Sequence, residues 1–296
     1  MNEYGVFRGD ERIAGATEEE VFAAVGLPWI PPELREGQGE IEAAESGRLP
    51  TLIAVSDLRG DLHMHTDASD GRSTLREMAD AAMALGRDYI AITDHSHNLT
   101  IARGMDASRL AEQGRAIDQL NAELGGRLRV LKGLEADILP DGTVDMPDQL
   151  AGLEWRIGSL HSHLQLPRDE QTKRVIRAIE SGLVDVIGHP TGRMIESRAP
   201  SDLDMEAIMV AAARCGVALE VNAFPDRLDL SDAHCRLARE LGTWLVIDTD
   251  AHAAGHLSGL HFGVDVARRG WLEPRHVLNT YPLAELLRRP RPPRPA

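Results

Sequence analysis

Short apolar runs alternate with amphipathic helical patterns along most of this 296-residue chain, and this alternation limits the possible folds more than any other feature. Runs of this kind read as strands that are buried on both faces. We expect seven of them, at residues 58–65, 89–93, 128–135, 155–161, 184–190, 217–221 and 244–252. Strands that alternate with helices predict a parallel sheet covered by helices. Seven such units favour a closed α/β barrel with a site at the carboxyl ends of its strands.

The two ends of the chain differ from this pattern. The expected domain boundaries are an N-terminal appendage at residues 1–50, a barrel domain at 57–288 and a basic, proline-rich tail at 289–296. Thr17 and Glu20 form a helix-start pattern in the appendage, and the acidic stretch 36–49 reads as a linker. The appendage is too short to build a core of its own, and the tail is expected to be disordered.

Composition narrows the class of protein. Apolar residues make up 43% of the chain, yet none of the apolar runs approaches the roughly 20 residues of a membrane span. The N-terminus lacks the features of a signal peptide, so a cytoplasmic location is expected. Cys215 and Cys235 lie in helical patterns and are better explained by packing than by a disulfide. The net charge of −15 argues mildly against non-specific wrapping of nucleic acid.

Metal-ligand residue types stand at the ends of six of the seven expected strands. His63 and His65 end the first strand, and alternation along a strand directs both side chains to the same side. Asp70 follows in a Ser-Asp-Gly turn. The later strand ends supply His95, Glu135, His161, His189, Asp250 and His252. An isolated strand-end histidine is usually structural, but the joint occurrence of these residues on one barrel face predicts a metal centre.

The ligand set limits the number and kind of ions. Nine candidate ligands are too many for one cation, and at three or four protein ligands per ion they suit two or three. Because the set contains no cysteine, it fits zinc, manganese or iron and does not choose between them.

Several sequence motifs then indicate a family. The motifs are DLHMHTDASDG, ITDHS, GLEADI, SLHSH, IGHPTGR and DTDAH. They resemble those of the PHP (polymerase and histidinol phosphatase) superfamily, which implies a distorted seven-stranded β/α barrel with a trinuclear metal site. The stretches NLTIARGM, QTKRVIRAIE and HPTGR are similar in particular to the C-terminal PHP domain of bacterial family X DNA polymerases.

The resemblance extends to the N-terminal appendage. The stretches NEYGVFRG and ATEEEVFAAVGLPWIPPELREG resemble the end of the thumb subdomain in the same polymerases. The resemblance thus covers nearly the whole chain. The catalytic palm of those polymerases would precede residue 1, so the chain is expected not to polymerise DNA.

The resemblance also implies how the ligands are shared among three divalent ions. Glu135 would bridge the first two ions. The three expected sets are His63, His65, Glu135 and Asp250; then Glu135, His161 and His189; then Asp70, His95 and His252. Metal ions lower the pKa of bound water and hold phosphate oxygens, so this arrangement suits phosphoester hydrolysis.

Further residues are candidates for catalysis. Glu135 and Asp250 are expected to act through the metal pair, and His163 is a candidate proton donor. Arg103 and Arg193 lie in Gly-containing loops and could clamp phosphate, although a surface ion pair is an equally good interpretation. Lys132, Arg198 and Arg227 are weaker candidates.

Three functions remain open from the sequence. The first is a 3′–5′ exonuclease or 3′-end-processing DNA repair nuclease, which the thumb-like N-terminus favours. The second is a small-molecule phosphatase for histidinol phosphate or a nucleoside bisphosphate, which the acidic charge and the few aromatic residues favour slightly. The third is a catalytically idle domain that positions a polymerase, and the complete ligand set speaks against it.

Overall fold

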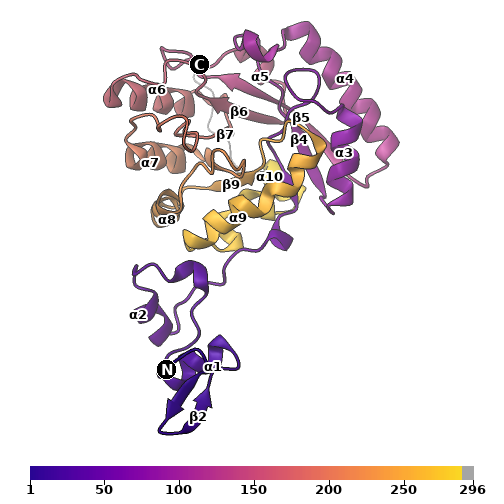
Figure 1. The fold of residues 1–296 in the computed structure, drawn as a ribbon. Coiled ribbons are helices and arrows are strands. Elements are labelled where there is room, and N and C mark those ends of the chain that lie inside the picture. The colour runs from indigo at the N-terminus through magenta and orange to yellow at the C-terminus, as the bar shows by residue number, and fades with distance from the viewer. Residues whose placement is uncertain (289–296) are drawn as a thin grey trace. The chain divides into compact units, whose positions relative to one another are not determined.

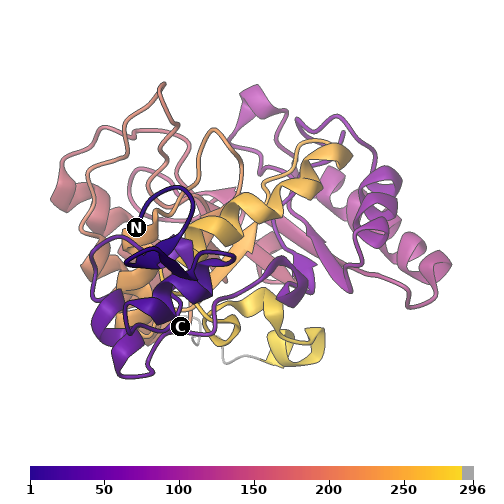
Figure 2. The same ribbon diagram turned by 60° about the horizontal axis from the view of Figure 1, so that its bottom comes forward.

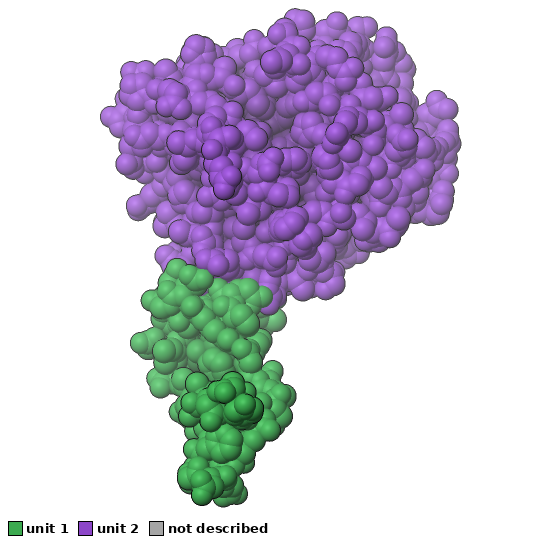
Figure 3. Space-filling model, in the orientation of Figure 1, with its two compact units in different colours: residues 1–52 green, residues 53–296 purple. Residues whose placement is uncertain are grey.

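The computed structural model describes residues 1–288 and divides them into two compact units (Figure 3). The first unit comprises Met1–Leu52, and the second begins at Ile53. The expected disordered tail at 289–296 lies outside the described residues. Within residues 1–288, none of the helices is both long and apolar enough to cross a membrane.

The second unit contains the predicted barrel. Seven parallel strands follow one another in chain order around the sheet (Figure 1). The strands are β3 (Gly60–Asp61), β4 (Tyr89–Ile92), β5 (Arg129–Asp137), β6 (Trp155–Ser159), β7 (Val186–Ile187), β8 (Ala218–Asn222) and β9 (Leu245–Asp248). Neighbouring strands pair in parallel register throughout, so the fold predicted from the sequence is confirmed.

Helices surround the strands, as the ribbon shows from two directions (Figures 1 and 2). Those of the barrel unit are α3 (Leu75–Ala84), α4 (Ala107–Leu124), α5 (Pro147–Leu150), α6 (Arg168–Glu180), α7 (Met205–Cys215), α8 (Asp232–Leu241), α9 (Leu260–Arg269) and α10 (Leu283–Arg288). Local sequence explains several boundaries. The Thr74 hydroxyl accepts a hydrogen bond from the Glu77 N–H at the start of α3, and Gly125 ends α4 in a left-handed conformation.

Alternate strand residues build two different layers of the core. Ile90 and Val130 pack outward against helix residues such as Met78 of α3 and Ile117 of α4. Their neighbours point to the opposite face, where Tyr89, Leu131, Trp155 and Val246 form the inner core of the barrel. The strands therefore look uniformly apolar in sequence because both of their faces are covered.

The first and last strands of the barrel, β3 and β9, are held together mainly by side chains. Within residues 1–288, β3 and β9 share no regular ladder, and one isolated bridge links Met64 to Ala251. Side chains complete this seam: the Leu62 N–H donates to Asp248 Oδ1 at 2.7 Å, and the Thr249 hydroxyl donates to Asp61 at 2.6 Å. The barrel is thus nearly closed, and polar side chains hold its last junction.

The N-terminal unit is a small assembly of short elements. It contains a hairpin of β1 (Val6–Arg8) and β2 (Glu11–Ala14), followed by α1 (Glu18–Ala24) and α2 (Glu40–Glu45). Thr17 caps α1 as its sequence pattern predicts. The helix α2 lies within the acidic stretch expected to be a linker. There the Glu40 carboxylate accepts hydrogen bonds from the N–H groups of Gly37 and Gln38 and fixes the turn that precedes the helix.

Two of the predicted strands are much shorter in the structure. The expected strand at 58–65 forms a ladder only at Gly60–Asp61, and the one at 184–190 only at Val186–Ile187. In both cases the chain leaves the ladder early and turns its polar residues toward the barrel mouth. Beyond the β3 ladder, the Met64 carbonyl accepts a hydrogen bond from the Thr93 N–H, and the His65 N–H donates to the Ala251 carbonyl on the other side.

Candidate metal centre

All nine predicted ligands lie at the carboxyl end of the barrel. Each follows or ends a strand, so the parallel sheet delivers side chains from distant parts of the sequence to one mouth. Groups of these residues have ligand atoms close enough to hold a metal ion. The set comprises His63, His65, Asp70, His95, Glu135, His161, His189, Asp250 and His252.

Glu135 is the central residue of the cluster. Its Oε2 atom lies 2.9 Å from His95 Nδ1 and 3.4 Å from His63 Nε2. Its Oε1 atom lies 3.0 Å from His189 Nε2 and 3.3 Å from His161 Nε2. The two oxygens of one carboxylate thus face two different groups of imidazoles, which is the geometry that a bridging ligand requires.

Asp250 completes the first group of ligand atoms. Its Oδ1 atom lies 3.1 Å from His65 Nε2 and 3.6 Å from His63 Nε2. The His65 nitrogen is in turn 3.5 Å from Glu135 Oε2. The structure therefore brings together the four residues expected to hold the first ion.

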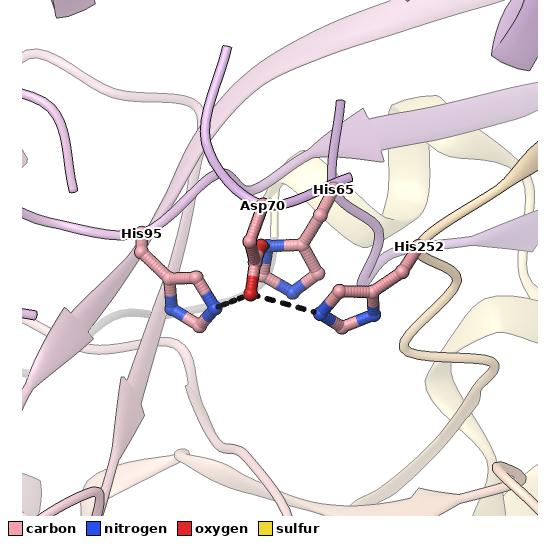
Figure 4. A group of neighbouring side chains, drawn as sticks. All are labelled: His65, Asp70, His95 and His252. Carbon is pink, nitrogen blue, oxygen red and sulfur yellow. Dashed lines mark ion pairs between the residues drawn. The ribbon is translucent and has the colours of Figure 1, made fainter. Parts of the chain in front are cut away.

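Asp70 is the centre of a second group near the surface (Figure 4). One of its oxygens lies between the rings of His95 and His252, 3.4 Å from the Nε2 atom of each. The ring of His65 lies behind them, with Nδ1 3.8 Å from the other Asp70 oxygen. These are the three residues expected to hold the third ion, with His65 added at their inner side.

The spacing of these atoms fits metal ions. A tetrahedral ion with bonds of about 2.0–2.1 Å holds its ligand atoms about 3.3–3.4 Å apart. The separations in the cluster range from 2.9 to 3.8 Å. They are too long for most to be good hydrogen bonds, but they match the edges of coordination polyhedra.

Unsatisfied buried atoms support the same interpretation. Within residues 1–288, both oxygens of Glu135 and the His63 Nε2 atom are buried without a hydrogen-bond partner. A buried carboxylate normally accepts several hydrogen bonds, because an isolated charge in the interior is costly. The residues present therefore fit divalent cations, which would neutralise Glu135 and use the free nitrogen lone pair of His63.

A second layer of carboxylates orients the imidazole rings. Glu220 Oε1 accepts a hydrogen bond from His63 Nδ1 at 2.6 Å, and Asp137 Oδ1 accepts one from His161 Nδ1 at 2.5 Å. Each bond places the proton on Nδ1 and leaves the Nε2 lone pair directed at Glu135. The other Glu220 oxygen accepts from the backbone N–H of His189, so one carboxylate fixes two ligands.

Asp94 holds the loop that carries Asp70. Its carboxylate accepts hydrogen bonds from the Thr66 N–H at 2.8 Å, the Thr66 hydroxyl at 2.6 Å and the hydroxyl of Ser69. Gln113 of α4 donates a fourth bond at 2.5 Å. The side chain that precedes His95 in sequence thus positions a ligand from another strand.

The charges of the cluster control its pKa values. Burial alone would lower the pKa of His63, but the facing carboxylates of Glu220, Asp250 and Glu135 raise it well above its usual value. Burial, followed by the neighbouring imidazoles, lowers the pKa of His65 to about 4. The surrounding histidines overcome the effect of burial at Glu135 and hold its pKa well below the normal range. The carboxylate of Glu135 is therefore ionised and the imidazole of His65 is neutral, whereas His63 would release a proton on binding a metal ion.

A cavity of about 340 Å³ opens over the cluster. Leu99, Ile101 and Ala102 line part of its wall, and Arg227 lies in its lining beside the ligands. The Arg227 Nε atom is 3.5 Å from Asp250 Oδ2. Its Nη1 atom is buried and, in the described part of the chain, has no hydrogen-bond partner. A guanidinium with a free donor beside a metal cluster is suited to bind a phosphate oxygen.

The other predicted residues take different positions. Arg193 donates from Nε to the Arg227 carbonyl at 2.8 Å and from Nη2 to the Leu228 carbonyl, so it supports the backbone that carries Arg227. Arg103 is exposed in the loop beyond Ala102. His163 is also exposed, and its carbonyl accepts hydrogen bonds from Gln171 and Arg174.

Sequence reasoning missed part of the site. It ranked Arg227 low and gave no role to Glu220, Asp137 or Asp94. A charged residue inside an otherwise apolar strand, such as Glu220 in β8, is an informative pattern because a buried charge needs a partner. The direction of the Arg227 side chain depends on the turn after β8, and composition does not reveal it.

The fold and the site together define a class of protein, namely metal-dependent phosphoesterases built on a seven-stranded barrel. Residues 61–223 match the PHP domain family, and residues 1–36 match the DNA polymerase beta thumb family. The chain belongs to the PHP domain family, as its motifs indicate.

Relatives of two kinds share this family. The chain is 44% identical over 289 residues to "DNA polymerase/3′-5′ exonuclease PolX" of Bacillus subtilis (strain 168), a match that covers 97% of this chain. The chain spans 50% of the length of that relative. It is also 32% identical over 238 residues to a "Probable phosphatase" of Shewanella sediminis (strain HAW-EB3), covering 76% of this chain and 91% of the relative.

A solved structure has the same fold. The histidinol phosphate phosphatase of Lactococcus lactis, crystallised with zinc, L-histidinol and phosphate, aligns with a TM-score of 0.52 at 18% identity. The alignment covers 72% of this chain and 93% of the phosphatase. At this identity the likeness supports the barrel fold alone.

Proposed function

We propose that this chain hydrolyses phosphodiesters at the 3′ ends of DNA, as a 3′–5′ exonuclease or 3′-end-processing repair nuclease. The observation that carries the proposal is the joining of a complete metal-ligand cluster to an N-terminal segment of the polymerase thumb family. The 44% identity to the exonuclease-containing relative extends over both parts.

We further propose three divalent ions, either zinc, manganese or iron. The first would be held by His63, His65, Glu135 and Asp250; the second by Glu135, His161 and His189; and the third by Asp70, His95 and His252. When bound, such ions supply Lewis acidity toward phosphate oxygens and lower the pKa of water. The distances around Glu135 and Asp70 support this distribution, and His95 lies between the first and third groups, with Nδ1 near Glu135 Oε2 and Nε2 near Asp70.

The chain's own residues prepare the site for this reaction. Glu220 and Asp137 keep the rings of His63 and His161 in the required tautomer. Arg227 offers a free donor to a non-bridging phosphate oxygen, and Arg193 holds the turn that presents it. Leu99, Ile101 and Ala102 form an apolar wall on one side of the cavity. His163 stays a candidate proton donor and Arg103 a candidate phosphate ligand, and both side chains are exposed.

A small-molecule phosphatase is the second candidate. The relative named "Probable phosphatase" matches 91% of its own length to 76% of this chain. A phosphate monoester would place its phosphate at the same cluster. The two candidates differ in what the enzyme recognises beyond the phosphate.

One experiment separates the candidates. The protein loaded with zinc, manganese or iron is incubated with a 5′-end-labelled single strand and, separately, with histidinol phosphate. We expect stepwise shortening of the strand, lost in Asp250→Ala and kept in the surface control Asp265→Ala. Phosphate release from histidinol phosphate without any shortening would favour the phosphatase, and the absence of both activities would overturn the proposal.

Metal content tests the ligand assignment independently of activity. Elemental analysis of the purified protein is expected to give about three ions per chain. His252→Ala is expected to lose one ion and keep the other two, because this residue lies only in the Asp70 group. Glu135→Gln is expected to lose at least one ion of the bridged pair. Equal metal content in the wild type and both variants would contradict the assignment.

A further inference from the structure

A second cavity, of about 270 Å³, lies beside the metal centre and differs from it in chemistry. Its walls include Phe224, His256 and Phe262, together with Pro225. The rings of Phe224 and His256 are 5.5 Å apart and tilted by 60°. Phe262 is 39% exposed, so its ring is accessible from solvent. These aromatic residues form an open, mostly apolar recess.

The recess is tied to the metal centre through one short turn. The Arg227 and Leu228 N–H groups both donate to the Phe224 carbonyl, at 2.8 and 3.0 Å. Phe224 therefore lines the recess, and three residues later Arg227 lines the metal cavity. A molecule whose phosphate contacts Arg227 could place an attached group against Phe224.

A second connection comes from the other side of the recess. The backbone N–H of the predicted ligand His252 donates to His256 Nδ1 at 3.3 Å. The ring of His256 thus forms part of the recess while it contacts the loop that carries a ligand. The recess and the metal centre are neighbours along both of their walls.

We propose that this recess binds the nucleobase of the nucleotide whose phosphate lies at the metal centre. The inference rests on the proposed function, and it names the part of the substrate recognised beyond the phosphate. Aromatic side chains bind bases by stacking, which is tolerant of sequence because every base has a flat π face. The Ser258 hydroxyl in the wall donates to the Gly255 carbonyl at 2.9 Å, so its proton is not available to a base.

The alternative location for a base is the opposite wall of the metal cavity. Ile101 lies there and is 92% exposed. An aliphatic side chain can cover a base, but it does not offer the stacking of an aromatic ring. Because different residues line the two locations, separate substitutions can test them.

Binding of mononucleotides provides the test. The four 2′-deoxynucleoside 5′-monophosphates and 2-deoxyribose 5-phosphate are titrated into metal-loaded protein by calorimetry. We expect each nucleotide to bind at least about tenfold more tightly than the base-free phosphate, with little difference among the four bases. Phe224→Ala or Phe262→Ala should remove most of this preference, and Phe262→Trp should keep it. Phe22→Ala, in the N-terminal unit, serves as the matched control.

The outcomes separate this inference from the proposed function. If the protein fails to shorten DNA but keeps a base preference that depends on Phe224 and Phe262, the recess binds free nucleotides and the inference stands. If the protein shortens DNA but the preference is absent, or persists in both alanine variants, the inference is wrong. Loss of the preference in Ile101→Ala alone would place the base on the opposite wall and would also overturn it. Shortening of a labelled strand with a raised KM in Phe262→Ala would identify the strand terminus as the source of the base.

Discussion

Two of the barrel's buried charged groups lie at its opposite ends, and they differ in how their charges are satisfied. At the amino ends of the strands, Arg156 and Asp185 form an ion pair with contacts of 2.9 and 3.1 Å. Arg156 also donates to the Gly182 carbonyl, and its backbone N–H donates to the same Asp185 carboxylate. The two side chains are 3% and 1% exposed. This group is complete within the protein.

The group at the carboxyl ends is incomplete without a ligand. In the described part of the chain, the oxygens of Glu135 have imidazoles around them but no hydrogen-bond partner. Arg227 likewise keeps one buried donor free, whereas each guanidinium nitrogen of Arg156 has a partner. The contrast teaches that burial of charge does not by itself identify a functional site. The metal centre differs because several unsatisfied charged groups line one cavity.

The largest effect should come from Glu135→Gln. Loss of the bridging carboxylate is expected to lower the rate of phosphoester hydrolysis by about 10³-fold or more, since metal stabilisation of the reaction contributes several kcal/mol. Hydrolysis rates of the metal-loaded proteins would measure the loss, with Glu206→Gln of α7 as control. An unchanged rate would break the comparison.

Asp185→Asn should lower stability and leave activity unchanged. It leaves Arg156 buried with a weakened partner, and we expect a loss of about 3–5 kcal/mol in the free energy of unfolding. Activity and metal content should be unchanged at temperatures where the variant is folded. Urea unfolding monitored by tryptophan fluorescence would measure the loss. Asp88→Asn, which breaks the exposed pair with Arg59, should cost less than about 1 kcal/mol and provides the control.

Arg227→Met tests whether Arg227, unlike Arg156, serves substrate binding and not stability. Because Arg227 makes few contacts in the protein, the substitution should leave stability nearly unchanged. It should weaken binding of phosphate-containing substrate by about 10- to 100-fold, the value of one or two charge-assisted hydrogen bonds. Inhibition by inorganic phosphate would measure the effect, and Arg227→Lys should restore part of the affinity. An unchanged inhibition constant would show that the free donor serves another purpose.

The smallest effect is expected for an ion pair at the surface, between Glu18 and Arg35, because solvent already screens its charges. Hydrogen bonds from Arg35, then from Trp29, lower the pKa of Glu18 to about 2. A lowered acid pKa stabilises the folded form above pH 4.5, and the contribution is lost as the pH falls toward 2. As the pH is lowered from 4.5 toward 2, the protection of the α1 amides against hydrogen exchange, corrected for the intrinsic rate, should therefore fall in wild type. It should fall less in Glu18→Gln. Equal pH dependence in both proteins would exclude a contribution from this pair.

The sequence predicted the barrel because its strands and helices have strong periodic patterns. The helical pattern of residues 107–124, between the second and third expected strands, forms α4 (Ala107–Leu124) in the structure. The nine ligand residues could be selected because parallel strands bring their carboxyl ends to one face, and the structure places them together. Their roles as metal ligands stay predictions. The strands expected at 58–65 and 184–190 are shorter in the structure, because the apolar pattern of a strand does not show where its pairing with the next strand ends.

Features that depend on tertiary contacts could not be predicted. Glu220 and Asp137 act by bonding to histidines on other strands, and neither has a local motif. The helix α2 forms in a stretch whose composition suggests a linker, because Glu40 organises the preceding turn. Gly188 is a similar case: a Cβ at this position would lie 2.4 Å from Ser159 Oγ and 3.4 Å from the His63 ring. Only the folded barrel reveals why a side chain is excluded there.

The seam between β3 and β9 has a consequence for the lifetime of the protein. His63 and His65 follow one edge of this junction, and Asp250 follows the other. An ion held by these three side chains would act as a clasp across the only neighbouring strands that, within residues 1–288, share no ladder. Loss of the metal would then do more than abolish activity. It would weaken the junction between β3 and β9 and make the chain more susceptible to proteolysis.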